Sequence, residues 1–249
     1  MKERYRVDLS YDGTEFHGSQ YQPDLRTVQG EVESSLRQLT WQGDSVLFAG
    51  RTDAGVHAAG QVIAFDLDWG HEEKDLQRAL NAVFPEDIAA RKVDRVEEDF
   101  HPRYHAKARH YRYQIRCSPV RHPLVERYSW RVWPEMNLQK LNQAAGPLVG
   151  THDFRAFGSP HQPEGSTIRE IRQANWQENA DLLVFDLVGN AFLYHMVRHI
   201  VITLVEIGQG KEPIRKIEEY LSDPEGPPAP GLAPARGLIL QEVIYESQA

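Results

Sequence analysis

The 249-residue sequence contains one cysteine, Cys117, which excludes an internal disulfide and any zinc or iron–sulfur site built from several cysteines. Because Cys117 ends a segment of alternating polarity, we expect it to be a small core residue rather than a nucleophile. No stretch of about 18 apolar residues occurs, so a transmembrane helix is not expected. The first residues, MKERYRVDLSYDG, lack the apolar segment of a secretory signal peptide. These absences predict a protein of a reducing, cytoplasmic compartment without membrane association.

Positive charge is scarce overall but concentrated in one segment. The formal net charge is −8, from 36 acidic and 28 basic residues, which argues against a general polyanion binder. Between Phe100 and Arg131, Glu126 is the only acidic residue, whereas eight residues are basic: Arg103, Lys107, Arg109, Arg112, Arg116, Arg121, Arg127 and Arg131. Such a stripe on an acidic protein indicates one anionic ligand bound in one place. The alternative, which the sequence leaves open, is that these charges simply alternate outward from a strand.

The first hundred residues alternate between strand and helix patterns. Apolar residues at every second position predict a strand over 5–11, and apolar residues at helical spacing predict helices over 28–40 and 73–84. Further strands are expected over 45–49, 61–67 and 88–96. The resulting β-α-β-β-α-β order is that of a ferredoxin-like unit.

The second half repeats this order. The predicted elements are a strand over 107–117, a helix over 137–148, a hairpin of 169–177 and 181–189, helices over 192–208 and 212–221, and a strand over 238–245. We therefore predict an α+β fold of two tandem ferredoxin-like halves, with antiparallel sheets joined side by side and an active-site cleft between the halves. The expected domains are 1–104, which carries the candidate catalytic residue Asp53, and 105–249, which completes the cleft.

The segment GRTDAGVHA, residues 50–58, places charged residues between two apolar runs. Asp53 is either an ordinary turn residue or a functional carboxylate. The nearby Arg51 favours function, because a guanidinium keeps a carboxylate ionised, and an ionised carboxylate in a cleft can act as a nucleophile or a base. The glycines of this region, at positions 50, 55 and 60, are expected to allow close approach of a bulky ligand.

Four further residues have both a structural and a functional interpretation. Arg198 is expected in the middle of the apolar helix 192–208, where it either needs a partner for a buried charge or extends from the edge of the buried face. His195 and His199 stand four residues apart, as metal ligands on a helix do, but no third ligand is evident, and we favour a core or surface pair. Tyr111 is either a core residue or a stacking surface for a nucleobase.

Six segments resemble, in the same order, the motifs of the TruA family of tRNA pseudouridine synthases. They are YDGTEFHGSQYQ (11–22), TVQGEVESSL (27–36), GRTDAGVHA (50–58), DFHPRYHAKARHYRYQI (99–115), NAFLYHMVRHIV (190–201) and GLILQEVIY (237–245). The resemblance implies the pseudouridine synthase fold and the isomerisation of uridine to pseudouridine at positions 38, 39 and 40 of the tRNA anticodon stem-loop. It also implies that no cofactor or metal is used, and that a homodimer binds tRNA with both subunits.

The same resemblance implies roles for individual residues. Asp53 matches the catalytic aspartate, which acts on a flipped-out base. Arg51 matches the arginine of the same motif, Tyr111 the tyrosine that packs on the target base, and Arg198 the arginine that pairs with the aspartate. Leu238 matches an apolar residue that lines the uracil pocket.

The sequence departs from the family at Ser19, where the family usually has tryptophan, so a stacking role at this position is in doubt. Phosphate contacts are expected from the basic stripe, at Arg103, Lys107, Arg109 and Arg112. Two rival hypotheses belong to other classes. A non-catalytic RNA-binding protein would give Asp53 no role, and a metal hydrolase would be built on His195 and His199.

Overall fold

The computed structural model describes residues 2–160, 162 and 164–246. The chain divides into two compact units, which we call unit 1 (Met1–Lys107 and Ile239–Ala249) and unit 2 (Ala108–Leu238). The end of the chain thus belongs with its beginning, whereas the sequence analysis assigned 105–249 to one half. None of the helices in the described ranges is long and apolar enough to cross a membrane.

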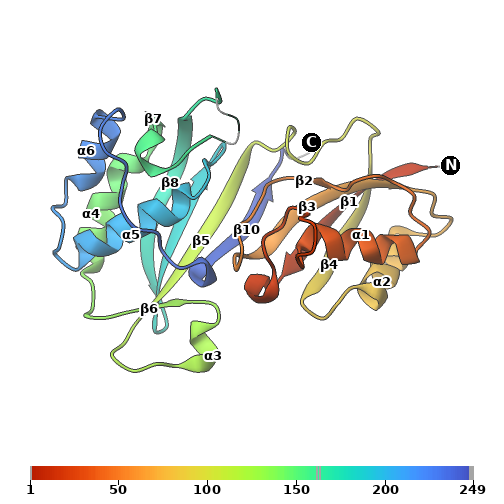
Figure 1. Cartoon of the computed structure of the whole chain (residues 1–249), viewed down its shortest axis with the longest axis horizontal. Helices are drawn as coiled ribbons and strands as arrows, with labels where there is room; N and C mark the ends of the chain where they lie inside the picture. The colour runs from red at the N-terminus through yellow and green to blue at the C-terminus, as the bar shows by residue number, and fades with distance from the viewer. Residues whose placement is uncertain (1, 161, 163, 247–249) are drawn as a thin grey trace. The chain divides into compact units, whose positions relative to one another are not determined.

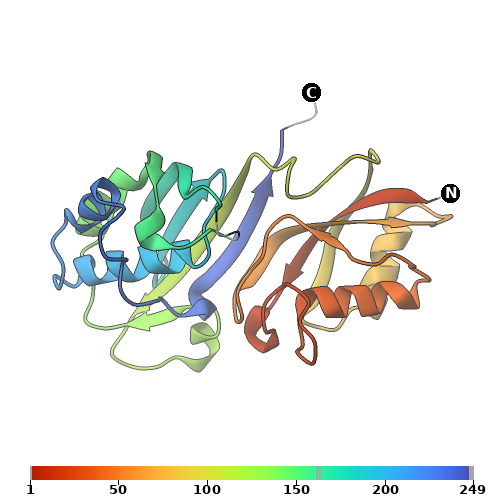
Figure 2. The same cartoon turned by 45° about the horizontal axis from the view of Figure 1, so that its top comes forward.

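Unit 1 is a sheet with two helices packed side by side against it (Figures 1 and 2). Its elements are β1 (Glu3–Tyr11), the 3-10 turn Gly13–Glu15, α1 (Val28–Gln38), β2 (Leu47–Phe48), β3 (His57–Leu67), α2 (Glu73–Val83), β4 (Ile88–Val96) and β10 (Leu238–Ile244). The strand order is β4-β1-β3-β10, with β2 beside β3. β1 runs antiparallel to β3 and β4, and β10 runs parallel to β3. The predicted β-α-β-β-α-β order of the first half is confirmed.

The local sequence explains these elements. The side chain of Thr27 accepts a hydrogen bond from Gly30 N–H and caps the first turn of α1. Val7 and Leu9 of β1 are fully buried against the helices, while the residues between them remain partly exposed. β3 begins at His57 rather than at residue 61, so the last residues of the GRTDAGVHA motif already belong to a strand.

Unit 2 has the second sheet, with its longer helices gathered on one side of the strands and the short helix Pro123–Glu126 apart from them (Figures 1 and 2). Its elements are β5 (Ala108–Cys117), α3 (Pro123–Glu126), β6 (Trp130–Val132), α4 (Leu138–Ala145), the 3-10 turn Gly146–Leu148, β7 (Gly150–Asp153), the 3-10 turn Arg155–Phe157, β8 (Ile168–Asn179), β9 (Leu182–Gly189), α5 (Met196–Gly208), α6 (Lys216–Ser222) and the 3-10 turn Ala235–Gly237. The strand order is β5-β9-β8-β7, antiparallel throughout, and β6 pairs in parallel with β5. α4, α5 and α6 contact one another.

The second half therefore repeats the first only in part. The final strand, β10, pairs with β3 of unit 1, where Ile239 lies opposite His57. β6 and β7 are strands that the sequence analysis did not expect. Both are short, and strands of three or four residues contain too few positions for alternation to be recognised.

The helix predicted over 192–208 begins only at Met196. His195 adopts a left-handed conformation with φ of 62°, which ends the preceding turn and starts the helix. Arg198 therefore lies in the first turn of α5, not in the middle of a helix. The apolar pattern extends past the true start because Leu193, in the preceding turn, is also buried.

One buried carboxylate, that of Asp186, joins β9 to side chains of the neighbouring strand β5. Asp186 of β9 is 3% exposed and lies 2.6 Å from His110 Nε2, and its Oδ1 accepts a hydrogen bond from Arg112 Nε at 2.9 Å. Burial by itself raises the pKa of Asp186, but the hydrogen bonds from His110 and Arg112 outweigh burial and hold this pKa below its ordinary value.

We expect Asp186→Asn to lower the free energy of unfolding by about 2 kcal/mol at pH 7, because Arg112 then loses its charged partner in a largely buried position. A carboxylate with a lowered pKa in the folded state stabilises the protein above its unfolded pKa of about 4 and loses this effect as the pH falls. The difference in thermal midpoint between the two proteins should therefore shrink from pH 7 to pH 3. The control is Asp181→Asn, whose exposed pair with Arg116 should matter little. Equal losses in both variants would contradict the prediction.

Candidate active site

The predicted catalytic loop connects β2 to β3. Asp53 lies on a tight turn, in which its carbonyl accepts a hydrogen bond from Val56 N–H at 3.1 Å and Gly55 adopts φ of 75°. Thr52, the residue before it, is buried, whereas Asp53 is partly exposed and Ala54 is exposed. The turn is thus held by its own backbone hydrogen bond and by the buried Thr52, while Asp53 remains partly exposed. Such a carboxylate can act as a nucleophile or a base.

A second segment packs against this loop. Gly55 N–H donates to Phe16 O at 3.2 Å, and a Cβ at Gly13 would lie 2.0 Å from Val56 O. Gly18 has φ of 97°, and a Cβ on it would lie 3.1 Å from Thr52 O. Glycine is required where two backbones approach this closely. The motifs at 11–22 and 50–58, separate in the sequence, therefore form one structure.

One of the three glycines expected to allow close approach of a ligand has a different role. Gly60 was predicted to admit a bulky ligand, but a Cβ there would lie 2.6 Å from Gln241 O, so it admits the neighbouring strand β10. His57, the first residue of β3, is buried, and its Nδ1 accepts a hydrogen bond from Gly13 N–H at 3.0 Å. The same nitrogen lies 3.1 Å from Asp12 Oδ1, so His57 connects the end of the catalytic loop to the residues that follow β1.

Unit 1 and unit 2 each hold part of the predicted set. Arg51 and Asp53 lie in unit 1, and the Arg51 side chain is exposed. Tyr111, Arg198 and Leu238 lie in unit 2. The expected pairing of Arg198 with Asp53 is a pairing between the units and stays a prediction.

Tyr111 projects from β5 and is 9% exposed. Its ring meets the edge of Phe192 at a centroid distance of 4.9 Å and an interplanar angle of 79°. This contact fixes the orientation of the tyrosine ring, as a stacking surface requires. Leu238, the first residue of β10, is also buried.

Arg198 holds the Pro/Gly-rich segment that precedes β10. Its Nε donates to Ala233 O at 2.7 Å, and Ala233 N–H donates back to Arg198 O at 3.3 Å. The next residue, Pro234, accepts a hydrogen bond from the Tyr113 hydroxyl at 2.7 Å. Burial raises the pKa of Tyr113, against the opposing charges of Arg198 and Arg236. Arg198 is therefore part of a cluster that shapes the segment before Leu238.

The sequence analysis missed Tyr113 as a member of this cluster. Tyr113 lies within the strand predicted over 107–117, and the residue is fully buried. The sequence could have indicated that Tyr113 has a partner, because a buried tyrosine hydroxyl usually requires a hydrogen bond. The partner is 121 residues away in the chain, so no local pattern identifies it.

The four residues expected to contact RNA already have partners within the protein. Lys107 Nζ lies 3.0 Å from a carboxylate oxygen of Glu246, and Arg109 donates to Asn190 O at 2.8 Å. Arg112 forms the ion pair with Asp186 described above. Arg103 is exposed, and its guanidinium lies 5.9 Å from the centre of the Tyr104 ring. The charge of Arg112 is therefore largely balanced by Asp186.

The histidine pair has no evident third metal ligand in the described part of the chain. The His195 and His199 rings are 6.2 Å apart, centre to centre, and no group of three or more His, Cys, Asp or Glu side chains there is placed to hold a metal ion. Burial lowers the pKa of His199, and the charges of His195 and Arg198 lower it further.

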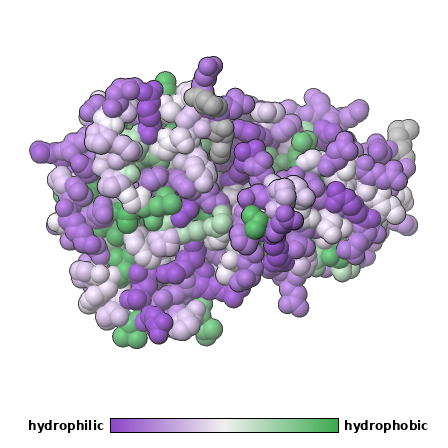
Figure 3. All heavy atoms as spheres, in the orientation of Figure 1, coloured by the Kyte–Doolittle hydropathy of each residue, from purple (hydrophilic) through white to green (hydrophobic). Residues whose placement is uncertain are grey.

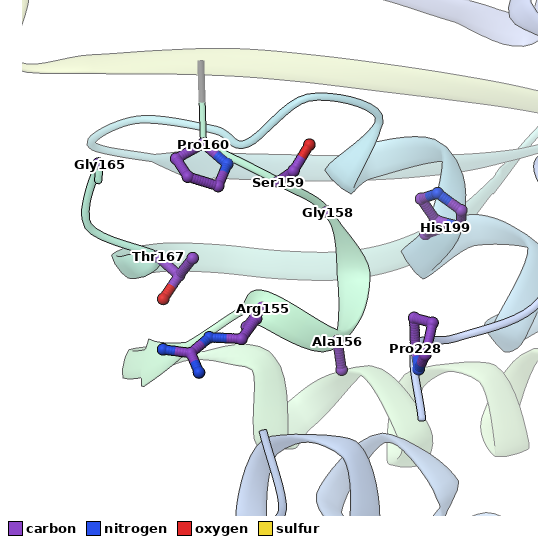
Figure 4. A pocket seen from close by; sticks show the side chains of 9 residues that line it. All are labelled: Arg155, Ala156, Gly158, Ser159, Pro160, Gly165, Thr167, His199 and Pro228. Atoms are coloured by element: carbon purple, nitrogen blue, oxygen red, sulfur yellow. The ribbon is translucent and has the colours of Figure 1, made fainter. Parts of the chain in front are cut away.

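A cavity of about 470 Å³ lies beside His199 in unit 2 (Figure 4). Arg155 lines one side of it, and its guanidinium pairs with Glu225. The other lining residues are Ala156, Gly158, Ser159, Pro160, Gly165, Thr167 and Pro228. None of the lining residues belongs to the predicted catalytic or substrate-binding set.

An α+β fold in which helices cover mainly antiparallel sheets is consistent with the pseudouridine synthase fold. A family model described as tRNA pseudouridine synthase matches residues 9–105 and 144–246. The chain therefore belongs to the tRNA pseudouridine synthase family, the isomerases that convert uridine in tRNA to pseudouridine, and the predicted resemblance is confirmed.

Individual relatives match over nearly their whole length. The chain is 40% identical over 248 residues to tRNA pseudouridine synthase A of Geobacillus sp. (strain WCH70), covering 99% of this chain and 100% of that protein. It is 41% identical over 242 residues to the protein of that name from Moorella thermoacetica, covering 96% and 98%. The protein of that name from Streptococcus agalactiae serotype Ia is 39% identical over 252 residues, covering 98% and 96%.

Proposed function

We propose that this protein converts the uridines at positions 38, 39 and 40 of the tRNA anticodon stem-loop to pseudouridine, with Asp53 as the nucleophile and without a cofactor. The observation that carries the proposal is the placement of Asp53 on a glycine-rich turn whose neighbouring backbone is buried and hydrogen-bonded. A carboxylate held in this way meets its substrate with little loss of conformational entropy.

The chemistry requires little more than a carboxylate. The N1–C1′ glycosidic bond breaks, the uracil turns, and its C5 forms a bond to C1′ and then loses its proton. No atom or electron is gained or lost over the whole reaction. A carboxylate at this position is compatible with three first steps, namely attack on C6, attack on C1′ or abstraction of a ribose proton.

The remaining roles concern access to the base. A uridine in a stem must leave the base stack, which costs a few kcal/mol. Stacking on Tyr111, whose ring Phe192 orients, offsets a comparable free energy of about 1–3 kcal/mol. Arg51 and Arg198 counter the repulsion between Asp53 and the RNA phosphates, and Leu238 lines the uracil pocket.

We further propose a cytoplasmic homodimer in which one tRNA contacts both subunits. The surface is mainly polar in the view of Figure 3. Several large apolar side chains are nevertheless exposed within residues 120–133, among them Leu124, which is 84% exposed, Val120 and Trp133. Exposed apolar side chains concentrated in one segment are typical of an interaction surface, and this supports the dimer.

The proposal is tested with a tRNA transcript that carries uridine tritiated at C5. Because C5 loses its proton in the reaction, we expect tritium release with the chelator EDTA present, and none from transcripts with cytidine at positions 38, 39 and 40. Binding without release would favour the non-catalytic RNA-binding protein. Release that depends on an added metal ion would favour a metal enzyme instead.

A further inference from the structure

Ser19 is buried, with 1% of its surface exposed, and contacts the residue that precedes Asp53. Its backbone N–H donates to Thr52 O at 3.0 Å, and its hydroxyl oxygen accepts from Thr52 N–H at 2.8 Å. Thr52 O belongs to the peptide group that joins Thr52 to Asp53, and Thr52 N–H to the one that joins it to Arg51. One residue thus restrains both peptide planes that lead into the catalytic loop.

The side chain of Thr52 is restrained as well. Its hydroxyl lies 2.8 Å from the hydroxyl of Tyr11, at the end of β1. Gln61 of β3 lies within 3.5 Å of the same tyrosine hydroxyl and donates to Gly50 O at 2.9 Å. Tyr11, Thr52 and Gln61 are all buried. Because water does not reach this network, it cannot replace a deleted partner.

We propose that Ser19 is a positioning residue, which orients the Asp53 carboxylate by fixing the peptide groups on both sides of Thr52. The proposal rests on Asp53 as the nucleophile. The contact requires an acceptor oxygen in the side chain at position 19. Tryptophan, the usual residue there in the family that the sequence resembles, has an indole that only donates. This chain therefore holds its catalytic loop by a serine hydroxyl.

The test compares two serine-to-alanine substitutions in unit 1. Ser19→Ala removes the acceptor for Thr52 N–H, and we expect kcat for tritium release to fall on the order of 10- to 100-fold, with KM and tRNA affinity within about twofold. Ser35→Ala is the matched control. Ser35 is also buried, but its hydroxyl donates to Val83 O at 3.2 Å, remote in the chain from the loop. That variant should lose thermal stability and keep its kcat.

A conservative variant and a second anchor complete the test. Ser19→Thr retains the hydroxyl and should recover most of the lost kcat. Tyr11→Phe weakens the restraint on Thr52 from the opposite side and should also lower kcat at unchanged KM, which provides the test if Ser19→Ala does not fold.

The outcomes separate the two proposals. If Asp53→Asn is inactive and Ser19→Ala turns over at the unaltered rate, the positioning role is overturned and the proposed function stands. Equal losses of kcat in Ser19→Ala and Ser35→Ala would also overturn it, because the effect would then follow stability. If Asp53→Asn retains turnover, the proposed function itself fails.

Discussion

Asp53→Asn is expected to abolish turnover, with a loss on the order of 10⁴-fold or more, while tRNA binding and fold are retained. The amide has nearly the shape of the carboxylate but no negative charge, so it cannot serve as the nucleophile. The turn itself should persist, because it depends on backbone groups such as Val56 N–H and on the conformation of Gly55. Single-turnover tritium release and filter binding of the same tRNA measure the two quantities separately.

The control for Asp53→Asn is Asp44→Asn. Asp44 is an exposed carboxylate in unit 1, so its replacement changes the net charge by the same amount. Both variants should bind tRNA at least as tightly as the unaltered protein, since each removes one negative charge. Turnover should remain normal in Asp44→Asn. Full turnover in Asp53→Asn would refute the aspartate mechanism.

Arg198→Ala is expected to lower kcat by about 10²- to 10³-fold, because a preorganised cation next to developing charge has effects of this size. The structure also gives Arg198 a second role, since its Nε–H holds Ala233. Arg198→Lys separates the two roles, because lysine keeps the positive charge but has no planar guanidinium. Partial recovery in the lysine variant would indicate an electrostatic role.

Equal losses in the alanine and lysine variants would indicate that Arg198 acts through the 223–236 segment. Limited proteolysis of that segment should then increase in both. Arg215→Ala serves as the control, because Arg215 is exposed and forms an ion pair with the nearby Glu219 of α6. Unaltered turnover in Arg198→Ala would contradict both roles.

The sequence was most informative where one face of an element is buried. Apolar residues at every second position predicted β1 to within two residues, and the strand expected over 88–96 is β4. The helices α1 and α2 were equally clear. The start of α5 was placed four residues too early, because the apolar pattern continues into the preceding turn, where Leu193 is buried. The left-handed His195 separates that turn from the helix. The spacing of apolar residues indicates which residues are buried, but not which conformation the backbone adopts.

The basic stripe shows a second limit of local reasoning. Counting charges between residues 100 and 131 found one acid, but Asp186 on the neighbouring strand neutralises Arg112, and Glu246 pairs with Lys107. Asp186 lies 74 residues from Arg112 in the chain. Glu246, the partner of Lys107, also lies outside the counted segment. The alternative that the charges alternate outward from a strand therefore describes Arg112 well.

By itself, the sequence determined the family, the α+β class and the identity of Asp53 as the candidate nucleophile, because these depend on short motifs and on periodic burial. Only the tertiary structure decided that β10 returns to unit 1, that Gly60 admits a strand rather than a ligand, and that Ser19 holds Thr52 across 33 positions of the chain. The physical reason is that each of these contacts involves a backbone N–H or C=O group, and almost every residue possesses both. Their partners are chosen by how the chain packs, and no local composition distinguishes them.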